Sequence, residues 1–245
     1  MKKLLLILIS LSACLYLGFV GSVIGATENH SENEVVVLAH GLGRSDTAMW
    51  LFKRRLEDEG FAVCTLDYSS IGETVASVLE VTTKQIDQCV SDAPTVHFVG
   101  HSLGGLVSRS YLQHHPELTN SSRLGHVVLM GTPNQGSEIA DHYDGSWVME
   151  FGGEISQALV TGENSLGNQL ELIDSNIGII AGTKSMILTN DAFSGPNDGL
   201  VSVESTKLIN MKDFIEIEVG HSNMRYNKEV AEQTVHFLKH GRFNH

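Results

Sequence analysis

The sequence predicts an α/β fold in which one parallel sheet is covered by helices on both faces. Short apolar runs rich in β-branched residues recur along the chain, helical segments separate them, and glycine turns directly follow several of them. Continuous apolar strands of this kind are typical of parallel sheets, because both faces of such a sheet are buried. At 245 residues, the chain has room for one large domain or two small ones.

Six segments are predicted to be strands of this sheet. The first, residues 34–39, is a short run of valine and leucine that ends at His40-Gly41. The other five are the similar runs 61–66, 95–99, 126–130, 177–181 and 214–219.

Four helices are predicted between and after these strands. The first spans 45–59, with Ser45 or Asp46 as its cap and Gly60 at its end. The others span 71–90, 103–115, which stops before Pro116, and 227–240, which Gly241 follows.

One long stretch, residues 138–175, departs from this alternation. It is too short to have a core of its own, so we expect it to be a cap or lid within a single domain of residues 35–240. Ligands of parallel sheets bind beyond the carboxyl ends of the strands. The residues of a functional site are therefore expected directly after strands.

The first 26 residues are predicted to direct export. Lys2 and Lys3 precede an uncharged, mostly apolar run over residues 4–26, and a polar stretch follows. We favour a signal peptide cleaved after Ala26. The run is also long enough for an uncleaved membrane anchor, and Cys14 ends a lipoprotein-like Leu-Ser-Ala-Cys. Under each alternative the domain is exported: it is periplasmic or secreted, or tethered to the membrane by residues 4–26.

The charge and the cysteines exclude several classes of protein. With 29 Asp and Glu against 16 Lys and Arg, the net charge is −13, so we expect no nucleic-acid partner. The three cysteines lack Cys-x-x-Cys spacing, so neither a zinc site nor a disulfide scaffold organises the fold. An exported chain would carry Cys64 and Cys89 into an oxidising compartment. We expect two buried free thiols, with a disulfide as the alternative.

Two glycine-rich turns directly follow predicted strands. Gly100-His101-Ser102-Leu103-Gly104-Gly105 lies between strand 95–99 and helix 103–115, which is the context of a nucleophile elbow that lifts Ser102 above the sheet. The alternatives are a phosphate-binding loop and an ordinary tight turn, but the motif lacks the lysine of phosphate-binding loops. His40-Gly41-Leu42-Gly43-Arg44 follows the first strand. Its glycines would let backbone N–H groups face a cavity, as acyl transfer requires, although a plain glycine turn has the same sequence.

Together these turns resemble those of the lipase and esterase type of α/β-hydrolase, including compact bacterial triacylglycerol lipases and inositol-deacylase-like lipases. The other matching pieces are Gly131-Thr132-Pro133-Asn134-Gln135-Gly136-Ser137, Asn197-Asp198-Gly199-Leu200-Val201 and Gly220-His221-Ser222. The resemblance implies Ser102 as nucleophile, Asp198 as acid and His221 as base. It also implies that the N–H groups of Leu42 and Leu103 form the oxyanion hole. Where the family often has a histidine after Gly-Thr-Pro, this chain has Asn134-Gln135, which leaves the acyl preference open.

The order of these residues along the chain agrees with the resemblance. Triads on this fold run serine, then acid, then histidine. His221 directly follows the last predicted strand, whereas His101 flanks the nucleophile on the same turn. Asp191 and Glu204 remain alternatives to Asp198, which lies in a Gly-Pro-Asn-Asp-Gly turn that would fix its direction.

The predicted activity is hydrolysis of a carboxylic ester of a lipid or another hydrophobic acyl compound, without a cofactor or a metal ion. Apolar residues that could hold the acyl chain are Met49, Trp50 and Leu51 after the first turn and Trp147, Val148, Met149 and Phe151 in the insertion. Helix packing explains the first group equally well, whereas for the insertion we favour contact with the substrate. An acyltransferase, a thioesterase or an amidase would use the same triad. A catalytically silent binding protein on this fold is a further alternative. The expected partner is a small-molecule or lipid ester, and the oligomeric state stays open.

Overall fold

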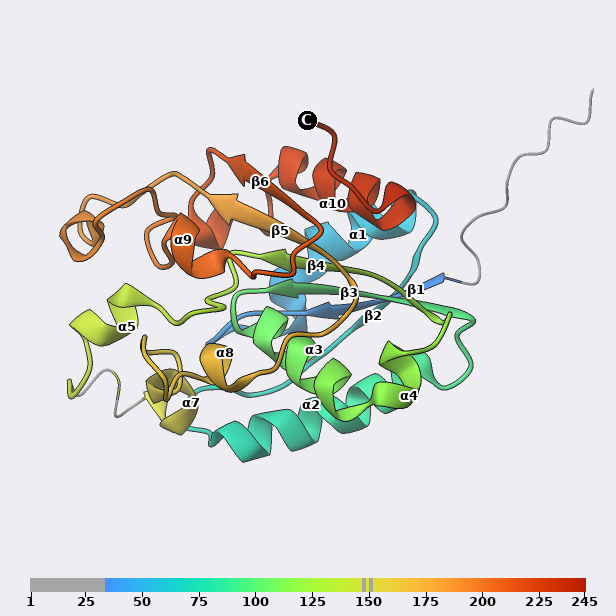
Figure 1. Ribbon diagram of the computed structural model, residues 1–245, viewed down its shortest axis with the longest axis horizontal. Helices are drawn as coiled ribbons and strands as arrows, with labels where there is room; N and C mark the ends of the chain where they lie inside the picture. The colour runs from blue at the N-terminus through green and yellow to red at the C-terminus, as the bar shows by residue number, and fades with distance from the viewer. Residues whose placement is uncertain (1–33, 147–148, 150–151) are drawn as a thin grey trace, which may run out of the picture.

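Six parallel strands form one sheet in the computed structural model, which describes residues 34–146, 149 and 152–245. The strand order is β2-β1-β3-β4-β5-β6 (Figure 1). The strands are β1 (Glu34–Ala39), β2 (Ala62–Thr65), β3 (Thr95–His101), β4 (Leu124–Met130), β5 (Asn176–Gly182) and β6 (Asp213–Ile217). Every neighbouring pair is parallel. The predicted fold class and the six parallel strands are confirmed.

Helices cover both faces of the sheet, and the side chains of β1 show why. Val37 and Ala39 pack into one apolar cluster, and Val36 and Leu38 pack into a second cluster on the opposite face. The first cluster includes residues of α2 (Val75–Val90) and α3 (Leu103–His114), and α4 (Pro116–Thr119) follows α3. The second includes residues of α1 (Trp50–Asp58) and α10 (Lys228–His240). Helices thus cover both faces of the sheet (Figure 1), and the alternation of strand side chains fills a core on each face.

The ends of some elements differ from the prediction. Helix 45–59 begins as a 3-10 turn, η1 (Asp46–Met49), before α1. Helix 71–90 starts only at Val75, because the Thr74 side chain caps it by accepting the Ser77 N–H and Gly72 has a φ of 78°. Strand β3 continues through Gly100 to His101, so it reaches the nucleophile turn itself.

The insertion over residues 138–175 contains three short helices among its described residues. These are α5 (Glu138–His142), α7 (Glu154–Gln157) and α8 (Leu166–Gln169). Ile155, Leu159 and Leu166 pack into the same apolar cluster as α2 and α3. The insertion therefore shares the main core on that face. Three further short elements lie in loops after β5 and β6, namely η2 (Asn190–Ala192), α9 (Val203–Thr206) and η3 (His221–Asn223).

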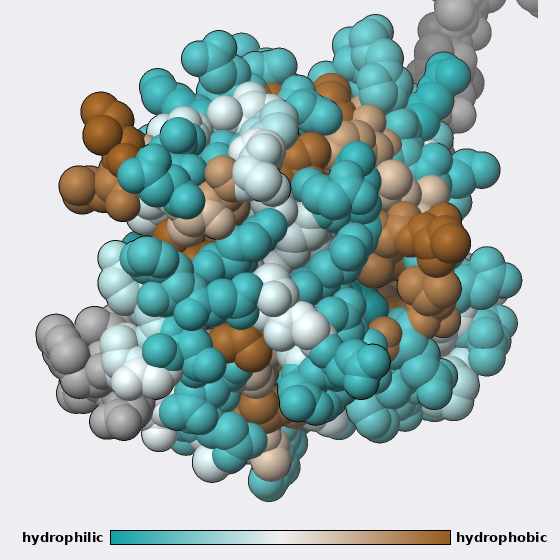
Figure 2. Space-filling model, turned by 60° about the vertical axis from the view of Figure 1, so that its left-hand side comes forward, coloured by the Kyte–Doolittle hydropathy of each residue, from teal (hydrophilic) through white to brown (hydrophobic). Residues whose placement is uncertain are grey.

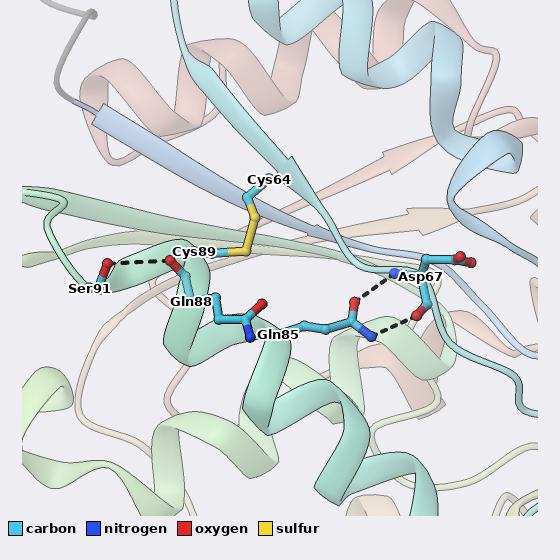
Figure 3. The surroundings of a disulfide bond; sticks show 6 residues. All are labelled: Cys64, Asp67, Gln85, Gln88, Cys89 and Ser91. Atoms are coloured by element: carbon cyan, nitrogen blue, oxygen red, sulfur yellow. Dashed lines mark hydrogen bonds between the residues drawn. A yellow bond between two sulfur atoms is a disulfide. The ribbon is translucent and has the colours of Figure 1, made fainter.

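Cys64 and Cys89 form a disulfide, so the expectation of free thiols was wrong. The bond joins β2 to the last turn of α2, with the two Cα atoms 5.9 Å apart. Gln85 fastens the same helix to the chain that follows β2. Its amide donates to the Asp67 carbonyl and accepts the Asp67 N–H at 2.6 and 2.8 Å (Figure 3). Packing of α2 along the edge strand brings the two cysteines within bonding reach.

In the part of the chain that the structure describes, no helix has the length and apolar character needed to cross a membrane. The predicted export segment, residues 1–26, lies outside the described residues.

Candidate active site

Ser102 lies at the turn between β3 and α3, as the motif predicts. Its φ of 55° is the only positive φ of a non-glycine residue among the described residues. A Cβ at Gly100 would come within 2.5 Å of Gly105, and one at Gly104 would overlap the Ala39 carbonyl. Only glycine fits at either position, since backbone crowds both. The Ser102 N–H donates to the Met130 carbonyl at 2.9 Å, which ties the turn to the end of β4.

His221 and Asp198 meet at the carboxyl edge of the sheet. His221 opens η3 after β6, and its Nδ1 lies 2.7 Å from Asp198 Oδ2. The other carboxylate oxygen, Oδ1, accepts the N–H groups of Leu200 and Val201 at 2.9 and 2.8 Å. The His221 N–H donates to the Asp198 carbonyl at 2.9 Å. Asp198 is fully buried, so this network fixes both the carboxylate and the ring.

The alternative acids lie elsewhere. Asp191 is exposed on η2. Glu204 is exposed on α9, where its carboxylate pairs with Lys207 at 2.7 Å. Of the three carboxylates that the sequence offered, the structure brings Asp198 to the His221 ring.

A cavity of about 350 Å³ opens above Ser102 and His221, which both line it. Most of the wall is apolar and includes Leu42, Ile71, Ile139, Met149, Leu159 and Val201. No carboxylate lines this cavity among the described residues. Nor does any cluster of His, Cys, Asp or Glu that could hold a metal ion occur in the part of the chain described.

The loop after β1 forms one side of this cavity. Gly41 and Leu42 line it, and a Cβ at Gly41 would come within 3.0 Å of Ser102 Cβ. Tyr68 and Ser70 hold the loop. The Tyr68 ring stacks on His40 at 4.0 Å and its hydroxyl donates to the His40 carbonyl, while the Gly43 N–H donates to Ser70 Oγ at 2.9 Å. The Leu42 backbone is thereby held beside the serine turn.

Leu103, the other predicted oxyanion residue, is the first residue of α3 and directly follows Ser102. Its side chain is fully buried. The first N–H groups of a helix have no carbonyl partner within that helix, so the start of α3 offers donors beside Ser102.

His101 contacts the site in a way that sequence reasoning missed. Its Nε2–H donates to the His221 carbonyl at 3.0 Å, and the two ring centroids lie 4.8 Å apart. Burial, and then the charge of His221, hold the pKa of His101 well below its usual range. The ring therefore stays neutral and links the serine turn to the histidine loop. The only sequence signal for this contact is the position of His101 beside Ser102, and that position was used only to exclude His101 as the catalytic base.

Of the apolar residues expected to hold an acyl chain, the structure brings Met149 to the cavity wall. Met49 is buried in the apolar cluster of α1 and α10, and Trp50 is 57% exposed. Trp147, Val148 and Phe151 lie outside the described residues. Pro133, in the Gly-Thr-Pro segment, does line the cavity.

The fold is that of the α/β-hydrolases, and it is shared with solved bacterial lipases and esterases. The mature lipase BlEst2 of Bacillus licheniformis is 22% identical, with a TM-score of 0.61 over 78% of this chain and 85% of that one. The metagenomic carboxyl esterase MGS0156 is 18% identical, with a TM-score of 0.58 over 78% of this chain and 65% of that one.

The phospholipase PlaB of Legionella pneumophila is 15% identical, with a TM-score of 0.61. The match covers 84% of this chain and 57% of PlaB. By sequence, the chain belongs to the family described as domain of unknown function DUF7379, whose model matches residues 25–187. No curated protein matches the chain.

Proposed function

We propose that the protein is a serine hydrolase that cleaves carboxylic esters of hydrophobic acyl groups through an acyl-enzyme on Ser102. One observation carries the proposal: the buried Asp198–His221 pair and the strained Ser102 turn open into the same apolar cavity. Backbone strain of this kind persists where the surrounding structure enforces it, and such positions cluster at active sites. The likeness to lipases and esterases supports the same class of reaction.

In the first step, Ser102 Oγ attacks the acyl carbonyl carbon while His221 Nε2 takes the serine proton. A carboxylate only accepts hydrogen bonds, so Asp198 Oδ2 requires the proton of His221 on Nδ1. The Nε2 lone pair is then free to act as base. The Asp198 charge also stabilises the imidazolium that forms.

The tetrahedral intermediate carries a negative oxygen, which needs hydrogen-bond donors. We assign this role to the backbone N–H groups of Leu42 and Leu103, one on the loop after β1 and one at the start of α3. One such donor is worth roughly 10²–10³ in rate. His221 then gives its proton to the departing alcohol. A water activated by His221 releases the acid from Ser102.

The apolar wall supports a hydrophobic acyl group as the part of the substrate that is bound. The cavity of about 350 Å³ lies at the small end of ordinary ligand pockets, which span roughly 300–1,000 Å³. A short or medium acyl chain fits this size better than a long one.

We also propose that the domain acts outside the cytoplasm. The Cys64–Cys89 disulfide supports this location, because such bonds persist in oxidising compartments. Mass spectrometry of protein from its native host tests the proposal. A mature chain starting near Thr27 indicates a cleaved signal, a membrane-bound chain starting at Met1 indicates an anchor, and a diacylated Cys14 indicates a lipoprotein. A cytoplasmic chain that starts at Met1 would refute export.

The enzymatic proposal is tested with a fluorophosphonate probe and p-nitrophenyl esters of increasing chain length. The wild-type protein should be labelled and should hydrolyse the esters, and Ser102→Ala should lose both properties. A folded wild-type protein that neither reacts with the probe nor cleaves any ester would favour a silent binding protein.

A further inference from the structure

The cavity mouth carries a positive charge that ester hydrolysis does not require. Arg44 lines the cavity and is exposed, so its guanidinium lies where the cavity meets solvent. It follows the candidate oxyanion residue Leu42 by two positions. Within the described part of the chain, Arg44 forms no hydrogen bond or ion pair. The acid closest to it in sequence, Asp46, accepts the Thr47 N–H at 2.6 Å instead.

A second guanidinium, that of Arg225, lies near enough for the charge of Arg44 to act on it. Arg225 is 6% exposed and donates to the carbonyls of Ser222 and Ala48 at 3.1 and 3.2 Å. Ser222 itself lines the cavity. Neither bond partner is a carboxylate, and no ion pair joins Arg225 to another described residue. Burial, with a smaller contribution from the charge of Arg44, lowers the pKa of Arg225.

Both charges also act on the centre of the site. Arg225 and Arg44 contribute to lowering the pKa of the buried His101, after burial and His221. Two guanidinium groups without a carboxylate partner thus act on the site, and Arg44 is the one of the two that lines the cavity. Carbonyl hydrogen bonds and the Tyr226 ring, 4.8 Å away, partly satisfy the Arg225 guanidinium. The repulsion between two neighbouring like charges still costs free energy. An anion bound at the mouth would offset it.

The charge of this rim is opposite to that of the whole chain. The net charge is −13, yet no carboxylate lines the cavity among the described residues. On the face at the carboxyl ends of the strands, hydrophilic side chains surround a few separate apolar patches (Figure 2). A local positive rim on an acidic protein draws anions to the mouth from a surface that otherwise repels them.

We propose that Arg44 is a specificity residue that binds an anionic group on the alcohol part of the ester. The apolar interior holds the acyl chain, so the alcohol part faces the mouth, where Arg44 lies. A phosphate monoester and a carboxylate share the chemistry that a guanidinium binds through paired hydrogen bonds. The inference rests on the proposed ester hydrolysis and adds the charge of the leaving alcohol to it.

Three esters with the same short acyl chain test this proposal. The alcohols are glycerol, which is neutral, glycerol 3-phosphate and glycerate. The acyl chain is short enough to keep all three esters monomeric in solution. Wild-type kcat/KM should be at least about tenfold higher for the phosphate ester than for the glycerol ester. High salt should reduce this ratio, because the Arg44 guanidinium is exposed. The glycerate ester distinguishes the two anionic groups. A preference for the glycerate ester alone assigns a carboxylate, and not a phosphate, as the group that Arg44 binds.

Arg44→Gln should abolish the preference, and Arg44→Lys should retain part of it. Arg54→Gln is the matched control, because Arg54 pairs with Asp58 on the outer side of α1 with 70% of its side chain exposed. That variant should keep the wild-type ratio. An equal kcat/KM for anionic and neutral esters in wild type, or an unchanged ratio in Arg44→Gln, overturns the inference. Both results leave the proposed function intact, whereas loss of turnover on all three esters together with absent probe labelling overturns the function itself.

Discussion

Replacement of Asp198 by Asn is the most informative perturbation of this site, because it changes charge and hydrogen bonding without changing shape. In the wild type, Oδ1 accepts two backbone N–H groups and Oδ2 faces His221 Nδ1 at 2.7 Å. The carboxylate is fully buried, so no water can take the place of either partner. An asparagine at this position has one acceptor and one donor to distribute between the two sides.

The surroundings decide which way the amide points. Its oxygen must face the N–H groups of Leu200 and Val201, because an NH₂ group there would oppose two donors. The NH₂ group then faces His221 Nδ1, which can only accept it without a proton. The proton of the imidazole moves to Nε2, and the ring can no longer take the proton of Ser102. Loss of the correct tautomer in this way costs about 10⁴ in turnover, or about 5 kcal/mol of transition-state stabilisation.

The assay is steady-state hydrolysis of a p-nitrophenyl ester by purified, folded variants. Asp198→Asn should lose about four powers of ten in kcat, while its unfolding midpoint stays near that of the wild type. Asp191→Asn is the control, because Asp191 is exposed on η2. It should retain most activity.

Two results would refute the reasoning. If Asp198→Asn keeps wild-type kcat, the carboxylate does not set the tautomer of His221. If Asp191→Asn is crippled instead, the acid of the working enzyme is Asp191, and the contact between Asp198 and His221 is structural.

Four further predictions concern the nucleophile, its turn, the disulfide and acid stability. Ser102→Ala should fold normally and lose roughly 10⁴–10⁶ in kcat, which an ester assay with a thermal melt will measure. Gly104→Ala should lower the melting temperature and the kcat together, because the added methyl group overlaps the Ala39 carbonyl. Cys64→Ser should remove about 3 kcal/mol from the free energy of unfolding measured in urea, since the bond joins positions 25 residues apart, and a reductant should have the same effect on the wild type alone. Burial, then the charge of His126, lowers the pKa of His97 from 6.5 to about 4. The unfolded chain therefore binds this proton more tightly, so stability from this group is complete above pH 6.5 and is lost as the pH falls toward 4. The urea midpoint of His97→Gln should fall less between pH 7 and pH 5 than that of the wild type.

The fold was predictable because each strand carries its own signal. The run 34–39, for example, is apolar at every position from Val35 onward, and the structure buries its side chains on both faces of the sheet. The ends of elements were harder to predict. Helix α2 begins four residues later than expected, because the capping Thr74 side chain decides where it starts and the spacing of apolar residues does not.

The candidate site likewise has parts that could be predicted from the sequence and parts that could not. The order of residues along the chain and the resemblance to lipases pointed to Ser102, Asp198 and His221, because a parallel sheet places every post-strand turn at one edge. Chain order left Asp191 and Glu204 open as the acid, since both also lie between Ser102 and His221. The disulfide was not predictable, because it depends on how closely α2 packs against β2, and sequence contains no such distance. The contact of His101 with the His221 carbonyl was missed for a related reason: it joins two loops that are 120 positions apart.

Glycines let the loops of the site pack closely, because they carry no Cβ. The site therefore depends on residues that take no part in the reaction. A Cβ at Gly41 would press on Ser102 from the loop after β1, within 3.0 Å of its Cβ. A Cβ at Gly131, which has a φ of 55°, would come within 3.0 Å of Asp198 Oδ2 and 3.2 Å of His221 Nδ1. The nucleophile and the acid–base pair thus each lie against a backbone that a side chain would displace. A shift of a few tenths of an ångström there moves reacting atoms while most of the core stays packed. We expect substitutions at these glycines to act on catalysis through the positions of the reacting atoms. At Gly131 they should cost stability as well, because its φ is positive and the buried Met224 Sδ lies 3.0 Å from the added Cβ.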